Sequence, residues 1–125
     1  MIKLTFCLRR LPHLSREEFQ HYWLESHAPL VAVRAKTLGI VKYEQVHAGL
    51  DALNTGIRAS RNAPEPYDGI AEIWFESEAA MAAAGQNPGA AEAARDLLED
   101  ERKFIDLENS PLWLNRVHTI VGSVS

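Results

Sequence analysis

The chain has 125 residues, of which 46% are hydrophobic and 24% are charged, and its formal net charge is −4. This length and balance predict one globular domain over residues 1–125, with a real hydrophobic core. The negative charge argues against a nucleic-acid partner, which needs clustered Lys and Arg. No apolar run approaches the roughly 20 residues of a membrane span, so no membrane partner is expected.

Cysteine and histidine usage bears on location and on cofactors. Cys7 is the only cysteine, and the first residues are too short and too charged a segment for a signal peptide. The expected location is therefore the cytoplasm. The cysteine and the five histidines lack the spacing of zinc ligands, and no glycine-rich nucleotide motif occurs. We expect neither a metal nor a cofactor.

The first expected elements are a strand and a capped helix. Apolar and polar residues alternate over residues 2–8, which is typical of a strand. Ser15 is a good N-cap, and Glu18 three residues later completes a capping box at the start of a helix. At 100° per residue, one face of this helix holds Phe19, Tyr22, Trp23, Ser26, His27, Leu30 and Val33.

Pro29 disturbs this helix close to its inward-facing histidine. Proline has no N–H to donate and disfavours helical geometry at the preceding residue, Ala28. We therefore expect a kink or a restart there, with free backbone polar groups near His27. Beyond it the helical pattern runs to about Lys36, and Gly39 is a suitable terminator.

The middle of the chain is expected to hold a strand and then a long loop. Residues 40–47 alternate, with Tyr43, Gln45 and His47 on one face and Ile40 on the other. Residues 49–66 show no sustained period. A connection of this length is either a lid or binding loop, or a tolerated surface insertion.

The remaining elements complete a recognisable order. A strand is expected at 67–76, then a short helix capped by Ser77 and closed by Gly85. A second helix should begin at Asn87-Pro88 and run to about Phe104, before a last strand at 113–121. The order strand, helix, strand, strand, helix, strand indicates the ferredoxin-like split βαβ fold, an α+β fold with a four-stranded antiparallel sheet. Both faces of these strands hold apolar residues, so a second copy is expected to cover the free face.

Two segments resemble a known family. The segment LSREEFQHYWLESHAPLV, residues 14–31, is similar to the first helix of the EthD family, a branch of the dimeric α+β barrel superfamily. The segment ERKFIDLENSP, residues 101–111, resembles the part of that family before its last strand. The resemblance implies a homodimer in which two sheets close into one barrel.

Two residues are candidates for catalysis. His27 can give or take a proton near neutral pH, and it matches the family's histidine in its motif context. It could instead be a structural histidine bonded to a free carbonyl near Pro29. Asp106, in the second family-like segment, could orient a histidine or bind a hydroxyl group. It could equally cap a helix end or pair with Arg102.

A group of aromatic residues could line a pocket for a small hydrophobic or aromatic molecule. Residues at such spacing can also be plain core. The candidates for substrate binding are Phe6, Tyr22, Trp23, Tyr43, Trp74 and Phe104.

A histidine, a carboxylate and a desolvated site suit proton transfer next to a carbonyl group. The resemblance implies a cofactor-independent lyase, cyclase or isomerase acting on a small aromatic or polyketide-like compound. One alternative is a non-catalytic ligand-binding or accessory protein of a degradation pathway. Others are a cofactor-free monooxygenase and a structural dimer with a filled core.

Overall fold

The fold is a single antiparallel sheet with helices along one face, as seen in a computed structural model that describes residues 1–122. The strands lie in the order β2-β3-β1-β4. Their bounds are Ile2–Leu8 for β1, Ile40–His47 for β2, Gly69–Phe75 for β3 and Leu112–Arg116 for β4. With both crossovers helical, this is the ferredoxin-like α+β arrangement that the sequence predicts.

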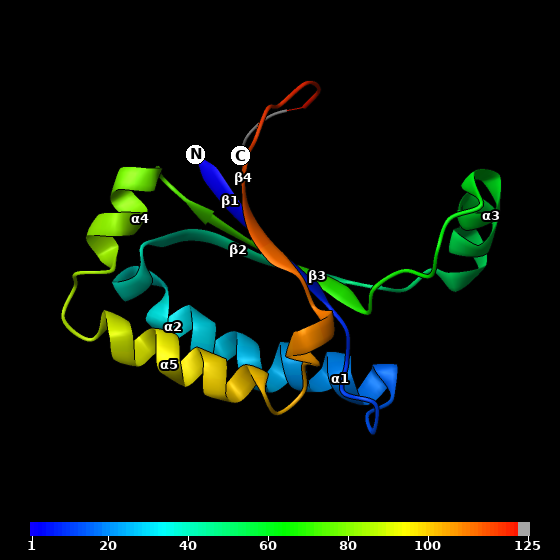
Figure 1. The fold of residues 1–125 in the computed structure, drawn as a ribbon, viewed down its shortest axis with the longest axis horizontal. Coiled ribbons are helices and arrows are strands. Elements are labelled where there is room, and N and C mark those ends of the chain that lie inside the picture. The colour runs from blue at the N-terminus through cyan, green and yellow to red at the C-terminus, as the bar shows by residue number, and fades with distance from the viewer. Residues whose placement is uncertain (123–125) are drawn as a thin grey trace.

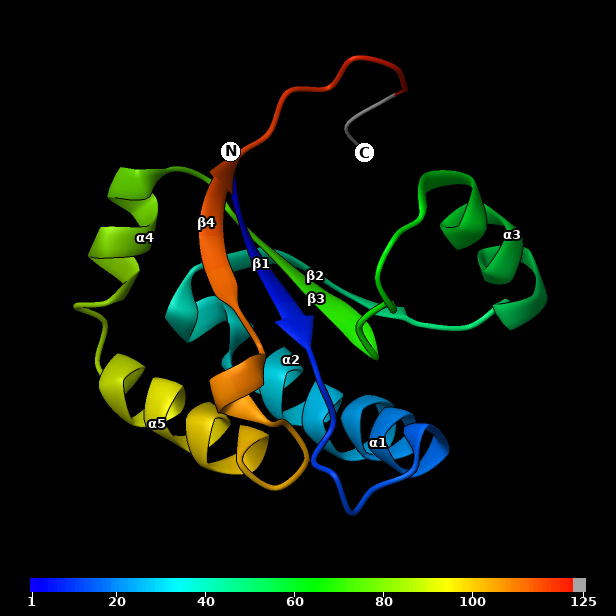
Figure 2. The same cartoon turned by 45° about the vertical axis from the view of Figure 1, so that its right-hand side comes forward.

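The first crossover is one nearly continuous helix, made of α1 (Arg16–Tyr22), a π-helical turn η1 (Trp23–His27) and α2 (Ala28–Leu38). The second crossover contains α4 (Glu78–Ala84), α5 (Ala90–Glu101) and a 3-10 turn η2 (Leu107–Asn109). A further helix, α3 (Asp51–Arg61), separates β2 from β3. Figures 1 and 2 show α1 and α2 running end to end beneath the sheet, with α5 alongside α2 and with α3 standing away from the sheet.

The core lies between this helical layer and the sheet. Phe6 of β1 is paired with Ala71 of β3 in the antiparallel register, and both side chains face the helices. The buried cluster consists of Phe6, Leu8, Phe19, Trp23, Ala71, Phe104 and Ile105. Burying this much aromatic and aliphatic surface is the main source of stability for the fold.

Local signals at the first helix are confirmed. The Ser15 hydroxyl accepts from the Glu18 amide at 3.0 Å, and the Glu18 carboxylate accepts from the Ser15 amide at 2.9 Å. Gly39 ends α2 with φ of 74°, a left-handed conformation that glycine adopts without steric cost. Ser77 likewise accepts from the Ala80 amide at 3.0 Å and caps α4.

The inward face of the first helix differs from the prediction after residue 23. The π-helical turn adds one residue to a turn, which rotates everything that follows. Val31 is therefore buried, whereas Val33 is 74% exposed and Ser26 is exposed as well. A regular 100° step cannot anticipate that rotation.

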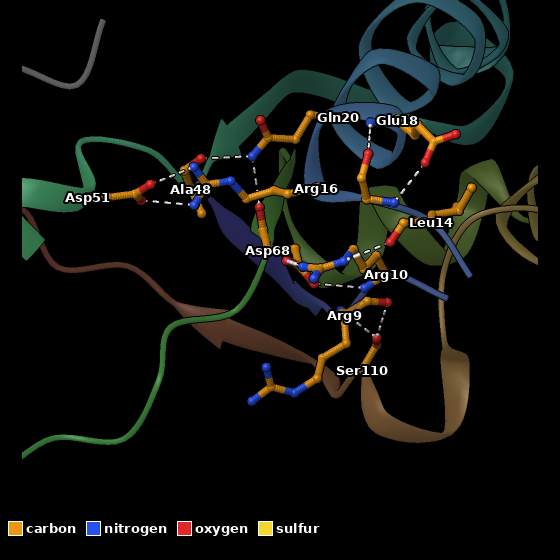
Figure 3. A network of polar contacts seen from close by, with 11 residues as sticks. Arg9, Arg10, Leu14, Arg16, Glu18, Gln20, Ala48, Asp51, Asp68 and Ser110 are labelled. Carbon is orange, nitrogen blue, oxygen red and sulfur yellow. Dashed lines mark hydrogen bonds and ion pairs between the residues drawn. The ribbon is translucent and has the colours of Figure 1, made fainter. Parts of the chain in front are cut away.

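The expected loop at residues 49–66 is corrected, because most of it is the helix α3. Asp51 in its first turn and Arg58 in its last turn complement the helix dipole. Asn62, in the left-handed conformation, ends the helix. The Arg16 guanidinium of α1 ties α3 to the body through two hydrogen bonds of 2.8 Å to Asp51 (Figure 3).

Three further boundaries or faces are corrected. The last strand ends at Arg116 rather than 121, because Arg116 already pairs with Ile2, the first residue of β1. The last long helix begins after Gly89, whose φ of 82° breaks the helical path from Asn87-Pro88. A register shift between Ile40 and Lys42 turns Ile40 toward the helices.

A polar network fixes the loop between β1 and α1 (Figure 3). The buried Asp68 carboxylate accepts from the Arg10 amide at 2.9 Å and forms an ion pair with the Arg10 guanidinium. Arg10 Nε donates to the Leu14 carbonyl at 2.9 Å, and Gln20 Nε2 donates to the Asp68 carbonyl at 3.2 Å. These contacts set the angle at which α1 begins, and so the position of the π-helical turn that follows it.

Candidate functional site

The site is built on the π-helical turn at Trp23–His27. Since Pro29 has no N–H, the ladder is broken here, and the Ala28 amide donates to the Trp23 carbonyl five residues back. The same carbonyl accepts from Gln45 Nε2 of β2 at 2.9 Å. The Trp23 carbonyl thus has two donors, and the turn carries the buried His27. Turns of this kind are frequent at functional sites.

His27 is held by an aspartate of α5. Its Nδ1 lies 2.7 Å from Oδ2 of Asp100, and both side chains are only 6% exposed. The Tyr22 hydroxyl donates to Oδ1 of the same carboxylate at 2.6 Å, and the Lys103 ammonium lies 3.5 Å from it. The Phe104 ring packs on His27 with 5.1 Å between centroids. The imidazole is therefore held by a carboxylate at Nδ1 and by a tilted contact with a phenyl ring.

This arrangement selects one tautomer of His27. An ionised carboxylate can only accept, so Nδ1 carries the proton and Nε2 keeps a lone pair when the ring is neutral. Burial lowers the pKa of His27 below its usual value, although the hydrogen bond and the charge of Asp100 act in the opposite direction. The ring is accordingly neutral at neutral pH and can accept a proton at Nε2.

The partners of His27 have matching electrostatics. Burial acts to raise the pKa of Asp100, but the hydrogen bonds from Tyr22 and His27 outweigh it, and the net pKa lies below its usual value. Burial, together with the hydrogen bond to Asp100, raises the pKa of Tyr22 to about 12. Asp100 therefore stays charged and Tyr22 stays a donor across the physiological range.

A small cavity of about 50 Å³ lies between the helices and the sheet beside His27. Because Nδ1 is taken by Asp100, Nε2 is the ring nitrogen open to a guest. The cavity is lined by Phe6, His27, Val31, Ile40, Tyr43, Ala71, Ile73, Leu97, Glu101 and Ile105. Its walls are apolar apart from His27, Tyr43 and Glu101.

Tyr43 borders both this cavity and the surface. It also lines a surface hollow of about 330 Å³, together with Leu24, Ala28, Gln45 and His47. The Tyr43 hydroxyl accepts from Gln45 Nε2 at 2.8 Å. One side chain thus forms a wall of both spaces.

The structure distributes the predicted pocket residues over three places. Phe6 and Tyr43 line the cavity. Tyr22 and Phe104 contact the His27–Asp100 pair but do not line the cavity. Trp23 is buried core, stacked on His47 at 4.4 Å.

Trp74 and Asp106 were predicted to belong to the site, but both lie away from it. Trp74 is on the opposite face of the sheet, where the ammonium groups of Lys3 and Lys42 lie over its ring at 5.3 and 4.6 Å. Asp106 precedes η2, and its carboxylate accepts from the Asn109 side-chain amide at 2.7 Å. The carboxylate that meets His27 is Asp100, one helix earlier in the chain.

A signal for Asp100 was available in the sequence. Ala90, Ala93, Leu97, Asp100 and Phe104 recur at helical spacing, so an aspartate occupies a position of the apolar face. A charged residue in such a place is buried only with a partner, and the one inward-facing histidine of the other helix was the natural candidate.

Comparison with known proteins identifies the family. The model of the EthD domain matches residues 11–108. The chain belongs to the EthD family. His27, Asp100 and Tyr43 lie within the matched part of this EthD domain, whereas the cavity residue Phe6 precedes it. None of the curated proteins compared with the chain matches the chain.

Solved structures share the fold of this EthD protein at low sequence identity. An ethyl tert-butyl ether d (EthD) family protein of Bacillus halodurans is 17% identical with a TM-score of 0.60, over 94% of this chain and 99% of that one. A dimeric protein of unknown function with a ferredoxin-like fold, from Bacteroides fragilis, is 12% identical with a TM-score of 0.55, over 93% and 95%. SnoaB of Streptomyces nogalater, a cofactor-independent oxygenase, is 18% identical with a TM-score of 0.51, over 97% and 98%.

Residues 1–122 contain neither a membrane-spanning helix nor a cluster of metal ligands. None of the helices there combines the length and the apolar character needed to cross a bilayer. Within the same residues, no three His, Cys, Asp or Glu side chains are grouped so that they could hold a metal ion.

Proposed function

We propose that this EthD protein is a cofactor-independent enzyme of the lyase, cyclase or isomerase type, acting on a small aromatic or polyketide-like compound by proton transfer. The observation that supports this most is the 2.7 Å contact between His27 Nδ1 and Asp100 in a buried site. A base oriented by a carboxylate, with its other nitrogen free, is the arrangement that general-base catalysis requires.

Burial makes this base suited to carbon acids. A neutral imidazole in an apolar cavity can take a proton from a carbon next to a carbonyl group without competition from water. Asp100 then stabilises the imidazolium ion that forms. Tyr22 holds that carboxylate in place through a hydrogen bond of 2.6 Å.

The size of the cavity requires that it opens for a substrate. An engineered protein cavity that takes up benzene measures about 150 Å³, which is larger than the 50 Å³ beside His27. Movement of Tyr43 would join this space to the 330 Å³ hollow outside. Tyr43 is therefore proposed as the side chain that a ligand displaces on its way to Nε2.

Cofactor-free oxygenation is a second candidate. Its support is the shared fold with SnoaB, which is described as a cofactor-independent oxygenase. A buried base would serve this reaction too, by forming the substrate anion that reacts with dioxygen. Oxygen consumption with a phenolic substrate, measured with an electrode, separates it from isomerisation or cyclisation, which consume none.

The experiment is a thermal-shift screen against aromatic acids, quinones and phenols, followed by turnover assays on the hits. Wild type is compared with His27→Asn, in which the side-chain amide can still donate to Asp100 but Nε2 is lost. His21→Asn, at an exposed position of α1, is the matched control. A ligand at a hundred times its dissociation constant should add about 2.7 kcal/mol of stability.

If His27 is the base, His27→Asn keeps ligand binding but loses turnover, while His21→Asn keeps both. Binding without turnover in wild type would favour the ligand-binding or accessory alternative. A screen without hits would favour a structural dimer with a filled core.

A further inference from the structure

A second ionisable side chain shares the cavity with His27. Glu101 is the last residue of α5, and it lines the same 50 Å³ space from a different helix than the histidine does. The neighbouring wall residues Phe6, Ile73 and Leu97 are apolar. The sequence pattern drew no attention to Glu101, because it lies in a run of charged residues at a helix end.

Nothing in the described part of the chain neutralises this carboxyl group. No hydrogen-bond donor holds it, and the only charges that act on it are those of its neighbours Asp100 and Arg102. Burial, with the repulsion of Asp100, raises the pKa of Glu101 to about 7, although Arg102 acts against the rise. A structural carboxylate is normally paired or fully exposed to water, whereas Glu101 is half-buried and has no hydrogen-bond partner within residues 1–122.

We infer that Glu101 is the proton donor that works opposite His27, giving a proton to the substrate while Nε2 of His27 takes one. This inference rests on the proposed function, and it adds the acid to the base. Two groups whose environments move their proton affinities in opposite directions form the usual acid–base pair of such enzymes.

The protons balance over one cycle. Nε2 of His27 removes a proton from the carbon next to a carbonyl group, and the C–H pair becomes a carbon–carbon double bond. The carbonyl oxygen takes the proton of the Glu101 carboxyl group, which gives an enol. The proton on Nε2 then returns to carbon, at the same or a conjugated position, and the enol O–H proton returns to Glu101.

The groups around Glu101 are compatible with this role. His27 of the π-helical turn and Tyr43 of β2 line the same cavity as Glu101. The charge of Glu101 helps to raise the pKa of Tyr43, for which burial is the larger cause. Asp100 and Arg102 flank it on its own helix. None of these groups donates a hydrogen bond to it, so its proton is free for a guest.

The test uses Glu101→Gln, which keeps the shape of the side chain but cannot give up a proton. Glu99→Gln, exposed on the same helix, is the matched control. The probe is β-tetralone in D₂O, and hydrogen exchange next to its carbonyl group is followed by NMR across pH. In parallel, the Glu101 carboxyl carbon of the wild-type protein is titrated by carbon-13 NMR.

We expect Glu101→Gln to slow exchange by roughly 100-fold or more and to remove the alkaline limb of the pH profile, with Glu99→Gln unchanged. Full activity of Glu101→Gln with that limb intact would overturn the inference while leaving His27 as the base. Wild-type exchange equal to that of His27→Asn would count against the proposed function instead. Titration of Glu101 at its ordinary value would overturn the inference whatever the probe does.

Discussion

Nδ1 of His27 lies 2.7 Å from Oδ2 of Asp100, although the two residues are 73 positions apart in the chain. The contact joins the two crossovers of the fold at the point where a proline has forced a π-helical turn. It makes the histidine a neutral, oriented base rather than a surface titrating group. The properties of this pair therefore depend on tertiary structure and can be changed by single substitutions.

Asp100→Asn should lower the pKa of His27 further, because the substitution removes the negative charge and the acceptor that raise it. Turnover by the proposed reaction should also fall, since the imidazole loses its fixed tautomer. The measurement is an NMR titration of the His27 ring. Asp96→Asn, which removes a partly exposed partner of Arg34, should leave that titration unchanged. A rise of the His27 pKa in Asp100→Asn would contradict the assignment.

The free energy of unfolding should depend on Glu101 above pH 4.5. The pKa of Glu101 is raised to about 7 in the folded state. Its contribution to the free energy of unfolding is therefore fully present below its pKa in the unfolded chain and is lost as pH rises through 7. Glu101→Gln should therefore match wild type near pH 4 and exceed it near pH 8, by on the order of 3 kcal/mol. Urea unfolding at both pH values measures this, and equal stabilities at pH 8 would refute it.

The contribution of His27 to the free energy of unfolding has the opposite pH dependence. Its pKa is lowered in the folded state, so its contribution is present above about pH 6.5 and is lost as pH falls below that value. In Glu101→Gln, where the carboxyl group no longer titrates, urea unfolding should show this acid-side loss without the alkaline one.

Much of the fold was predictable because local signals and periodicity agree. The capping box at Ser15, the glycine at 39 and the alternation over residues 2–8 each act within a few residues. The helix α3 was missed because Asn54 and Gly56 are poor helix formers, and its apolar residues are exposed rather than buried. Leu53 is 66% and Ile57 is 62% exposed.

The site was only half predictable for a related reason. Pro29 marks a disturbance next to His27. It does not reveal that the disturbance is a π-helical turn, which shifts the buried face to Val31. Helical spacing marks Asp100 as an inward-facing charge that needs a partner, but its contact with His27 joins distant segments and is established only by the tertiary structure. A family-like segment pointed to Asp106 instead, six residues away.

Gly69→Ala should destabilise the protein, although alanine is usually tolerated better than glycine in a strand. A Cβ atom at Gly69 would lie 2.4 Å from Cζ3 of Trp23, so the indole that packs on this glycine would have to move. The expected loss is about 1–3 kcal/mol, measured by urea unfolding. Gly56→Ala in α3 meets nothing within 4 Å and should stabilise by about 0.5–1 kcal/mol. The reverse order of the two effects would show that Trp23 packs elsewhere.

The protein should be a dimer at micromolar concentration by light scattering. The face of the sheet away from the helices carries Trp113, 47% exposed, and Val46, 44% exposed, and a second copy would cover them. Trp113→Glu should give a monomer, whereas Val33→Glu, on the exposed side of α2, should not. A monomeric wild type would end the prediction of a paired sheet.

The most direct test of the central claim is the protonation state of the two His27 ring nitrogens, read by nitrogen-15 NMR at pH 7. The orientation by Asp100 requires a proton on Nδ1 and none on Nε2, with a pKa below about 6.5 for the ring. A ring protonated on Nε2 alone, or on both nitrogens at pH 7, would contradict the role of His27 as the buried base.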